Sequence, residues 1–268
     1  MLEPRLFTGI VLGLVSIAAA IFYPVCGILV SLLSFIGLYE FYYMVEKKGV
    51  QLFKPFGLGV GLFICVSIYF HFTIKEGWQF LFAVFGLFML FLLELRKQAA
   101  HQPILSISAT VFGIIYISWC FSFLLRIRQL EEGAMLTGFL LLVTKSSDIG
   151  AYYWGKSAGR TPFMEKISPK KTLEGAVGGF FTSLSAGLLF SLFLKSITVL
   201  ESFFLIIILA IVSQLGDLFE SLIKRDCQVK DSGKLLPGMG GVLDVIDSII
   251  FTAPICYLYV TMMRPVNL

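Results

Sequence analysis

Charged residues are scarce in this sequence of 268 residues. Asp, Glu, Lys and Arg together make up 14% of the chain, against about 25% in ordinary soluble domains. Hydrophobic residues make up 57%, and the mean hydropathy is +0.90. Such a composition excludes a disordered chain, an ordinary soluble enzyme and a nucleic-acid-binding domain, so no nucleic acid is expected as a partner. It indicates an all-α polytopic integral membrane protein embedded in a lipid bilayer.

Cysteine patterns typical of metal or redox sites are also missing. The five cysteines are scattered, with no Cys-x-x-Cys and no Cys/His grouping. Four lie in apolar runs, where Cys behaves as a small buried hydrophobe, and Cys227 lies in a polar loop. Internal repeats, low-complexity stretches and long linkers are absent as well. We therefore expect one membrane domain, residues 1–268.

Apolar stretches of about 20 residues, the length that crosses a bilayer, recur along the chain. We predict about nine transmembrane helices in one bundle, at 6–23, 25–44, 56–72, 78–95, 104–125, 135–154, 176–194, 197–215 and 242–263. Basic residues favour the cytoplasmic side, which predicts a cytoplasmic N-terminus and cytoplasmic loops around 156–171 and 224–234. The opposite side then holds only Lys75, Arg126, Arg128, Lys195 and Arg264.

The two halves of the chain differ in character. Residues 1–135 carry almost no ionisable side chains within their apolar stretches, and we interpret them as scaffold helices. Residues 136–268 bring polar and charged side chains into the ends of apolar helices and into two long polar loops. The chemistry is therefore expected in the second half.

Some charged residues in the second half have a partner one helical turn away. Lys145 and Asp148 are three positions apart, and Glu220 and Lys224 are four apart. Side chains at these spacings share a helix face. Salt bridges inside the bundle explain both pairs without any further function.

Three aspartates, Asp217, Asp244 and Asp247, have no Lys or Arg one turn away on the inner side. A charged side chain at a helix centre costs about 2.5–3.5 kcal/mol on insertion scales. Converging carboxylates repel one another unless a cation lies between them. Oxygen ligands without His or Cys suit Mg²⁺. The pattern predicts a Mg²⁺ site, and it leaves open whether a second cation binds.

Two polar loops combine lysines, hydroxyls and glycines. Residues 168–179 place such residues just before an apolar helix, where free backbone N–H groups bind phosphate; an anchor for lipid headgroups is the alternative. Residues 221–241 are first basic and then glycine-rich, and Gly238, Gly240 and Gly241 allow a close approach of backbone to a ligand. Carboxylates for Mg²⁺ beside lysines for phosphate indicate phosphoryl or nucleotidyl transfer at the membrane surface.

A long motif runs through the second loop. It reads Ser221-x-x-Lys224-Arg225-x-x-x-x-Lys230-Asp231-x-Gly233-x-x-Leu236-Pro237-Gly238-x-Gly240-Gly241-x-x-Asp244-x-x-Asp247. Two shorter blocks precede it, Asp148-x-x-Ala151-Tyr152-x-x-Gly155 and Ser168-Pro169-Lys170-Lys171-Thr172-x-Glu174-Gly175. Together they resemble the signature of the phosphatidate cytidylyltransferases (CDP-diacylglycerol synthases) over roughly residues 144–250. Met239 and Val245 depart from it, since the family usually has His and Arg there.

The resemblance implies a reaction of phospholipid biosynthesis, in which CTP and phosphatidate give CDP-diacylglycerol and pyrophosphate with Mg²⁺. It assigns the metal to Asp217, Asp244 and Asp247, and catalysis to these three residues and Lys224. Lys224, Arg225 and Lys230 are assigned to CTP or pyrophosphate. Ser168, Lys170 and Lys171 are assigned to a phosphate. The remaining motif positions assigned to substrate binding are Thr172, Ser221, Asp231, Gly238, Gly240 and Gly241. A homodimer in the bacterial inner membrane, with its active site facing the cytoplasm, is also expected.

Two other functions are considered. A CTP-dependent polyprenol kinase or an isoprenoid-lipid cytidylyltransferase would use the same chemistry on a different lipid acceptor. The sequence gives little information about which lipid the acceptor is. A cation-coupled transporter would use Asp148, Asp217, Asp244 and Asp247 as an ion path, and it predicts repeat symmetry with acids near helix centres. The sequence has no visible repeat, and its acids cluster beside basic loops.

Overall fold

The computed structural model describes residues 2–72, 76–96, 102–165 and 167–263. In chain order its elements are α1 (Leu2–Ile21), α2 (Tyr23–Lys47), α3 (Lys54–Tyr69), α4 (Glu76–Leu95), α5 (Pro103–Gly113), a π-helical turn η1 (Ile114–Trp119), α6 (Cys120–Arg128), α7 (Gly133–Ala158), β1 (Pro162–Met164), β2 (Ser168–Thr172), α8 (Leu173–Ser191), α9 (Val199–Asp226) and α10 (Leu243–Met263). Each predicted apolar stretch coincides with a helical segment, and α5, η1 and α6 together form the one predicted at 104–125. The all-α membrane class is thus confirmed for the described residues, with one small hairpin added.

Local sequence signals set several helix starts. Proline occupies the first turn of α2, α3 and α5, where its missing N–H costs no hydrogen bond. Thr198 and Glu201 form a capping box at the start of α9. The Thr172 hydroxyl accepts a hydrogen bond from the Gly175 N–H and caps α8. These caps define where the helices of the second half begin.

Five of the described helical segments are long and apolar enough to cross a membrane by length and composition: α2, α5–α6, α8, α9 and α10. Shorter apolar helices cover Phe7–Ile21, Lys54–Tyr69 and Leu81–Leu95. Helix α7 is long enough, but Lys145 and Asp148 lower the hydropathy of its middle. Nine crossings therefore stay a prediction.

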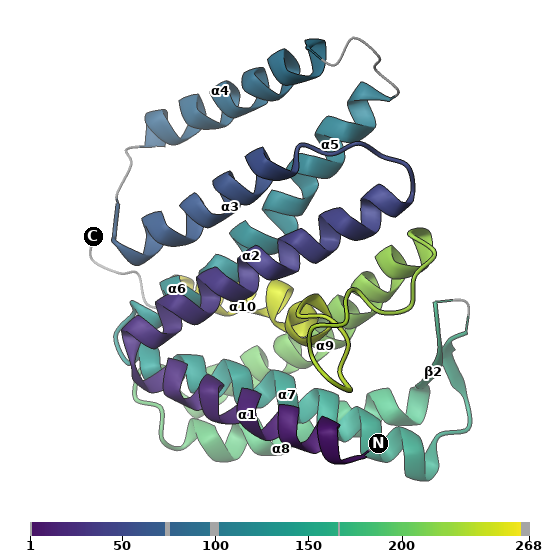
Figure 1. The fold of residues 1–268 in the computed structure, drawn as a ribbon. Coiled ribbons are helices and arrows are strands. Elements are labelled where there is room, and N and C mark those ends of the chain that lie inside the picture. Colours follow the sequence, from purple (N-terminus) through teal and green to yellow (C-terminus); the bar gives the residue numbers. More distant parts are fainter. Residues whose placement is uncertain (1, 73–75, 97–101, 166, 264–268) are drawn as a thin grey trace.

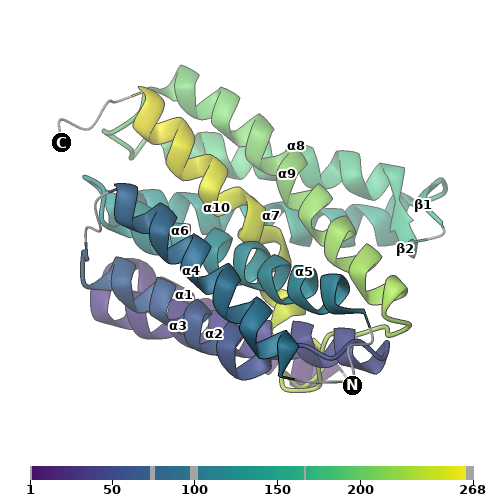
Figure 2. The same ribbon diagram turned by 90° about the horizontal axis from the view of Figure 1, so that it is seen from above.

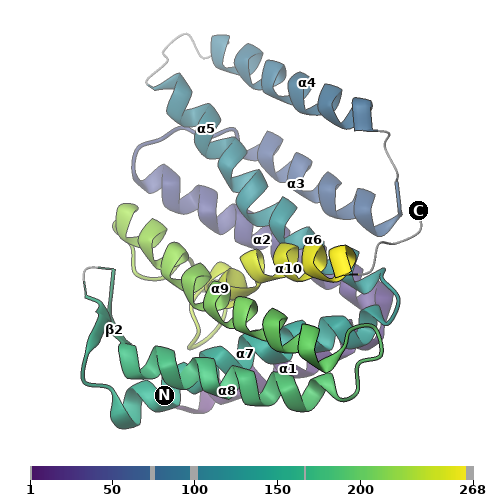
Figure 3. The ribbon, with the colours of Figure 1, turned by 180° about the vertical axis from the view of Figure 1, so that it is seen from behind.

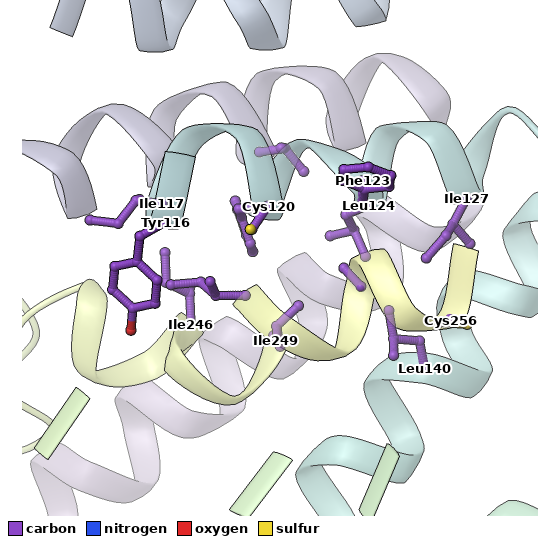
Figure 4. Packing of buried hydrophobic residues seen from close by; sticks show 14 of the residues in the cluster. Tyr116, Ile117, Cys120, Phe123, Leu124, Ile127, Leu140, Ile246, Ile249 and Cys256 are labelled. Carbon is purple, nitrogen blue, oxygen red and sulfur yellow. The ribbon is translucent and has the colours of Figure 1, made fainter. Parts of the chain in front are cut away.

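Helix α10 lies at the centre of the bundle. It packs against α9 and α7 on one side and against α6 and α2 on the other, and α4 lies at the outer edge beside α5 (Figures 1 and 3). Figure 4 shows Ile246 and Ile249 of α10 facing the apolar side chains of η1 and α6. Because α10 contacts helices from both halves of the chain, residues of the first half can lie close to the charged side chains of the second half.

The start of α1, the β1–β2 hairpin and the loop that follows α9 share one end of the bundle, while α10 ends at the other (Figure 2). The two basic loops thus lie on the same side as the N-terminal helix start. Which face of a membrane this end meets stays a prediction. Lys75 and Arg264, two basic residues used in that prediction, lie outside the described residues.

The β1–β2 hairpin is not predicted by the sequence, which indicated a loop there. Its antiparallel strands pair Pro162 with Thr172 and Met164 with Ser168. Glu174, in the first turn of α8, accepts hydrogen bonds from the backbone N–H groups of residues 160 and 161 at 3.0–3.2 Å. This carboxylate ties the start of the hairpin to α8, so the chain arrives at α8 as a strand.

Candidate active site

Three carboxylates meet where α9 packs against α10. Asp217 and Glu220 lie one turn apart on α9, Asp247 lies on α10, and one oxygen of each falls within 4.8 Å of the other two. Gly216 allows this approach, because a methyl group there would meet the Asp247 carbonyl oxygen at 2.9 Å. Glu220 is fully buried, and Asp247 is 6% exposed. We call these three residues the acid cluster.

Asp244 does not belong to the acid cluster, although the sequence places it with Asp217 and Asp247. Its Oδ1 accepts from the Lys224 ammonium at 2.6 Å, and its Oδ2 accepts from Gly241 N at 2.7 Å. Oδ2 also accepts from Ser232, from N at 3.0 Å and from Oγ at 2.9 Å. The loop between α9 and α10 folds back over the first turn of α10 and engages both oxygens. Glu220 takes the third place in the cluster.

The Lys224 ammonium lies between Glu220 and Asp244 and forms ion pairs with both. The Glu220–Lys224 salt bridge is therefore confirmed. The pair with Asp244 was missed, because helical spacing reveals only partners on the same helix. Since the Lys224 side chain is 11% exposed, these two carboxylates take most of its hydrogen-bonding capacity.

Lys171 brings a second cation to the cluster. It extends from β2, and its Nζ lies 2.6 Å from Asp217 Oδ2. Lys170 precedes it on the strand and is exposed, as expected when successive side chains point to opposite faces. Ser168 is half-buried at the other end of β2, and Thr172 is occupied as the cap of α8.

A third lysine reaches the region from α7. The Lys145 ammonium donates to Asp148 Oδ2 at 3.0 Å, which confirms the predicted pair. It also donates to the Val245 carbonyl at 2.9 Å and to Ser248 Oγ at 3.1 Å, which in turn donates to Asp148. At position 245, which departs from the family motif, the backbone carbonyl is thus the group that binds Lys145.

The remaining motif residues frame the site. Arg225 Nε donates to the Ile167 carbonyl at 3.2 Å and ties α9 to the hairpin. Ser221 is buried in α9, whereas Lys230 and Asp231 are exposed. The Cys227 thiol is buried, and burial raises its pKa, so a reactive thiolate is disfavoured.

The glycines of the loop between α9 and α10 allow that loop to fold. Gly238 and Gly240 have φ of +78° and +100°, which L side chains rarely adopt. A methyl group at Gly240 would lie 2.5 Å from Asp244 Oδ2. The turn between Leu236 and Gly240 is closed by a hydrogen bond from Leu236 N to Gly240 O at 2.9 Å. The glycine run thus closes the loop over Asp244.

Among the described residues, acids outnumber lysines in this region. The acids are Asp148, Asp217, Glu220, Asp244 and Asp247, and the lysines paired with them are Lys145, Lys171 and Lys224. With every group ionised, the excess is two negative charges, the charge that one divalent cation balances. Both Glu220 oxygens are buried. Oε2 pairs with Lys224, whereas Oε1 has no hydrogen-bond partner within the described residues, so Oε1 suits an oxygen-seeking cation.

Two residues were missed by the sequence analysis. Glu220 was explained by its salt bridge alone, although its spacing from Asp217 already placed both on one face of α9. Glu40 was overlooked within the apolar stretch of α2, and it is buried against the loop that precedes α10. A lone acid inside an apolar helix was the available signal.

The chain is similar to known proteins over most of its length. The model of the Cytidylyltransferase family matches residues 3–263. A phosphatidate cytidylyltransferase of Synechocystis sp. is 35% identical over 266 residues, 88% of each chain. The Bacillus subtilis phosphatidate cytidylyltransferase is 41% identical over 53% of this chain and 54% of its own. The uncharacterized protein YnbB of Escherichia coli is 44% identical over 56% of this chain and 50% of its own, so these last two matches span about half of each relative.

Proposed function

This chain belongs to the cytidylyltransferase family, and on that premise we propose that it is a phosphatidate cytidylyltransferase of phospholipid biosynthesis. The relative from Synechocystis, which carries that name, supports this over 88% of both chains. The observation that carries the proposal is the 2.6 Å contact between Lys171 and Asp217. It supports a site in which a cation that would bind phosphate lies directly beside carboxylates suited to a metal.

The acid cluster would hold Mg²⁺ in this proposal, with Asp217, Glu220 and Asp247 as ligands. Glu220 replaces Asp244 in the set predicted from sequence, because both oxygens of Asp244 are already engaged by Lys224 and the loop. When bound, Mg²⁺ neutralises charge on the CTP phosphates and on the leaving pyrophosphate. The sequence does not decide whether a second cation binds.

The reaction requires two polyanions to meet. An oxygen of the phosphatidate phosphate attacks the α-phosphorus of CTP, the bond from that phosphorus to the bridging oxygen breaks, and pyrophosphate leaves with the bond electrons. The attacking oxygen is already ionised near pH 7, since the second pKa of a phosphate monoester is about 6. The site therefore needs no general base, and its work is to bind, orient and balance charge.

The basic residues divide that work. Ser168, Lys170 and Lys171 of the hairpin hold the lipid phosphate, and Arg225 and Lys230 hold CTP or pyrophosphate. Lys224 was predicted to contact CTP, but its burial between Glu220 and Asp244 favours a role as their counter-charge. Thr172, Ser221, Asp231 and the loop glycines shape these elements around the substrates.

The location follows from the same pattern. We place the protein in the bacterial inner membrane with this site at the cytoplasmic face, because both basic loops lie at the end where α1 starts (Figure 2). The phosphates of CTP are then reached from the aqueous side, and phosphatidate stays in the bilayer. A homodimer rests on the family resemblance, and chemical cross-linking in membranes tests it.

The test is an assay in detergent micelles with phosphatidate, labelled CTP and Mg²⁺. We expect a lipid-soluble cytidine product and pyrophosphate, both lost with EDTA and in Asp217→Asn. Asp226→Asn is the matched control, since Asp226 ends the same helix and its exposed carboxylate pairs with Lys48. Label transfer to a polyprenol in place of phosphatidate would show that the lipid acceptor is a polyprenol. Absence of product with both lipids would overturn the proposal.

A further inference from the structure

Glu40 is a buried acid in the half of the chain that the sequence presents as scaffold. It lies on α2 and is 7% exposed. Its Oε1 accepts a hydrogen bond from Val242 N at 3.1 Å, and its Oε2 accepts one from Leu243 N at 2.9 Å. These N–H groups open α10, and the first N–H groups of a helix have no partner within the helix. Glu40 thus caps α10 from another helix.

The charge of Glu40 is matched by backbone. Within the described residues its carboxylate forms no ion pair, and the positive end of the α10 dipole faces it. Burial of a carboxylate without hydrogen bonds costs a great deal. A buried acid with this arrangement is stable only while the loop and the start of α10 keep their present positions, so the loop and Glu40 depend on each other.

The loop fits closely around this carboxylate. A methyl group at Gly241 would lie 2.5 Å from Glu40 Oε2, and one at Gly233 would collide with Oε1. Both glycines belong to the motif that resembles the family signature. Glu40, which was not part of that motif, explains the lack of a side chain at Gly233, and Glu40 and Ser232 Oγ together explain it at Gly241.

One hydroxyl connects Glu40 to the candidate active site. Ser232 Oγ lies 3.2 Å from Glu40 Oε2 and 2.9 Å from Asp244 Oδ2. Asp244 in turn accepts from Lys224, whose ammonium contacts Glu220 of the acid cluster. The contacts therefore run without interruption from α2 to the buried member of the cluster.

The same contacts fix the orientation of Asp244. Its Oδ2 accepts from Ser232 N and Gly241 N. Gly241 directly precedes Val242, whose N–H donates to Glu40, and the Ser232 hydroxyl itself lies 3.2 Å from Glu40 Oε2. If the loop moved away from Glu40, both donors would move away from Asp244. Lys224 would then lose its fixed partner and shift relative to Glu220.

We propose that Glu40 is a positioning residue for the reaction, which rests on the function proposed above. It does not touch the acid cluster. It anchors the 232–243 loop to α2, and through Ser232 and Asp244 it sets where the Lys224 charge lies beside the cluster. The first half of the chain thereby takes part in arranging the site.

Glu40→Gln tests this with nearly unchanged size. An amide has one acceptor oxygen where the carboxylate has two, so one of the two backbone N–H groups at 242 and 243 faces an NH₂ group. We expect kcat to fall about tenfold, because small misplacements in a site cost rate, and the Mg²⁺ concentration for half-maximal activity to rise about fivefold. The KM for phosphatidate should stay within about twofold, since the hairpin is untouched.

Glu46→Gln is the matched control. Glu46 lies on the same helix, and its partly exposed carboxylate pairs with Lys54 rather than with the loop. Hydrogen exchange of peptides from 232–243 gives a readout independent of activity: it should speed up in Glu40→Gln and stay unchanged in Glu46→Gln. A purely structural role would lower the folded fraction and leave the Mg²⁺ dependence of the folded protein unchanged.

Ser232→Ala provides a second variant that keeps the Glu40 charge. Ser232→Ala alone should also slow turnover. It should slow turnover less when Glu40→Gln is already present, because both changes break the same chain of contacts from Glu40 through Ser232 to Asp244. Wild-type exchange, kcat and Mg²⁺ dependence in Glu40→Gln would overturn the inference. Failure of the wild-type protein to form product would instead overturn the proposed function, and the exchange experiment would still report whether Glu40 holds the loop.

Discussion

The ammonium of Lys171 lies 2.6 Å from the carboxylate of Asp217 and joins the β1–β2 hairpin to α9. The two residues come from separate motifs, one rich in lysine and hydroxyls and the other acidic. Their contact brings these motifs together, so that a phosphate bound at Lys171 would lie next to a cation held by Asp217. Both substrates of a nucleotidyl transfer can meet there.

Replacement of Lys171 by Ala tests the hairpin as a phosphate site. We expect the KM for phosphatidate to rise about tenfold, because a charge-assisted hydrogen bond to phosphate is lost, worth about 1.5–3 kcal/mol. Lys156→Ala is the control, since Lys156 is exposed in the last turn of α7. Steady-state kinetics with varied phosphatidate gives the answer. An unchanged KM for both substrates would assign the hairpin to headgroup anchoring instead.

Lys224 is predicted to stabilise the fold. Lys224→Met leaves Glu220 fully buried without its counter-charge, and breaking a buried ion pair costs about 3–5 kcal/mol. Unfolding in mixed detergent micelles should show this loss. The double variant Lys224→Met with Glu220→Gln removes the Glu220 charge as well and leaves only Asp244 without its lysine partner, so it should recover part of the stability and remain inactive. Equal stability of the two variants would contradict the ion pair.

The helices, and the acids that share one face of a helix, could be predicted from the sequence, because residues on the same helix face are only three or four positions apart. The spacing of Asp217 and Glu220 placed both on one face, and the Lys145–Asp148 pair was predicted and is present. The partners of Asp244 were not accessible, since Lys224 reaches it only after the intervening loop closes. Tertiary contacts of this kind leave no periodic trace in a sequence.

Glu40 illustrates the same limit at longer range. Its hydrogen bonds join α2 to the start of α10, and nothing in the spacing of residues relates the two. The hairpin was also missed, because its strands are short and depend on Glu174 of α8. The sequence therefore predicts which residues are chemically capable, and the fold decides which of them meet.

Mg²⁺ should stabilise the protein against heat through the acid cluster. A ligand at 100 times its dissociation constant adds about 2.7 kcal/mol to the free energy of unfolding, so Mg²⁺ should raise the Tm of the wild-type protein by several degrees. Asp247→Asn should abolish this rise. Asp226→Asn, at an exposed position on α9, should keep it. Equal Tm increases in both variants would show that Mg²⁺ binds elsewhere.

Met239 stands where the family usually has His, and we predict that the exchange is tolerated. Its side chain extends toward α1, and a methyl group at Gly9 would lie 3.3 Å from Met239 Cε. Met239→His should retain at least about half of the wild-type turnover, because within the described residues no hydrogen bond or ion pair joins position 239 to the acid cluster or its lysines. A severe loss would mean that packing against α1 determines the shape of the loop.

Gly240 should be required for more than its backbone conformation. Gly240 and Gly49 both have positive φ, +100° and +87°, so Ala at either position pays about 1–2 kcal/mol for a left-handed backbone. Only at Gly240 does the added methyl group meet the site, 2.5 Å from Asp244 Oδ2, whereas at Gly49 nothing lies within 4 Å. Gly240→Ala should therefore lower kcat at least about tenfold, and Gly49→Ala should lower the free energy of unfolding by a similar strain while turnover stays near that of wild type. Unfolding curves and kinetics on both variants separate strain from displacement of Asp244. If the two variants lose turnover equally, the position of Asp244 does not control the reaction.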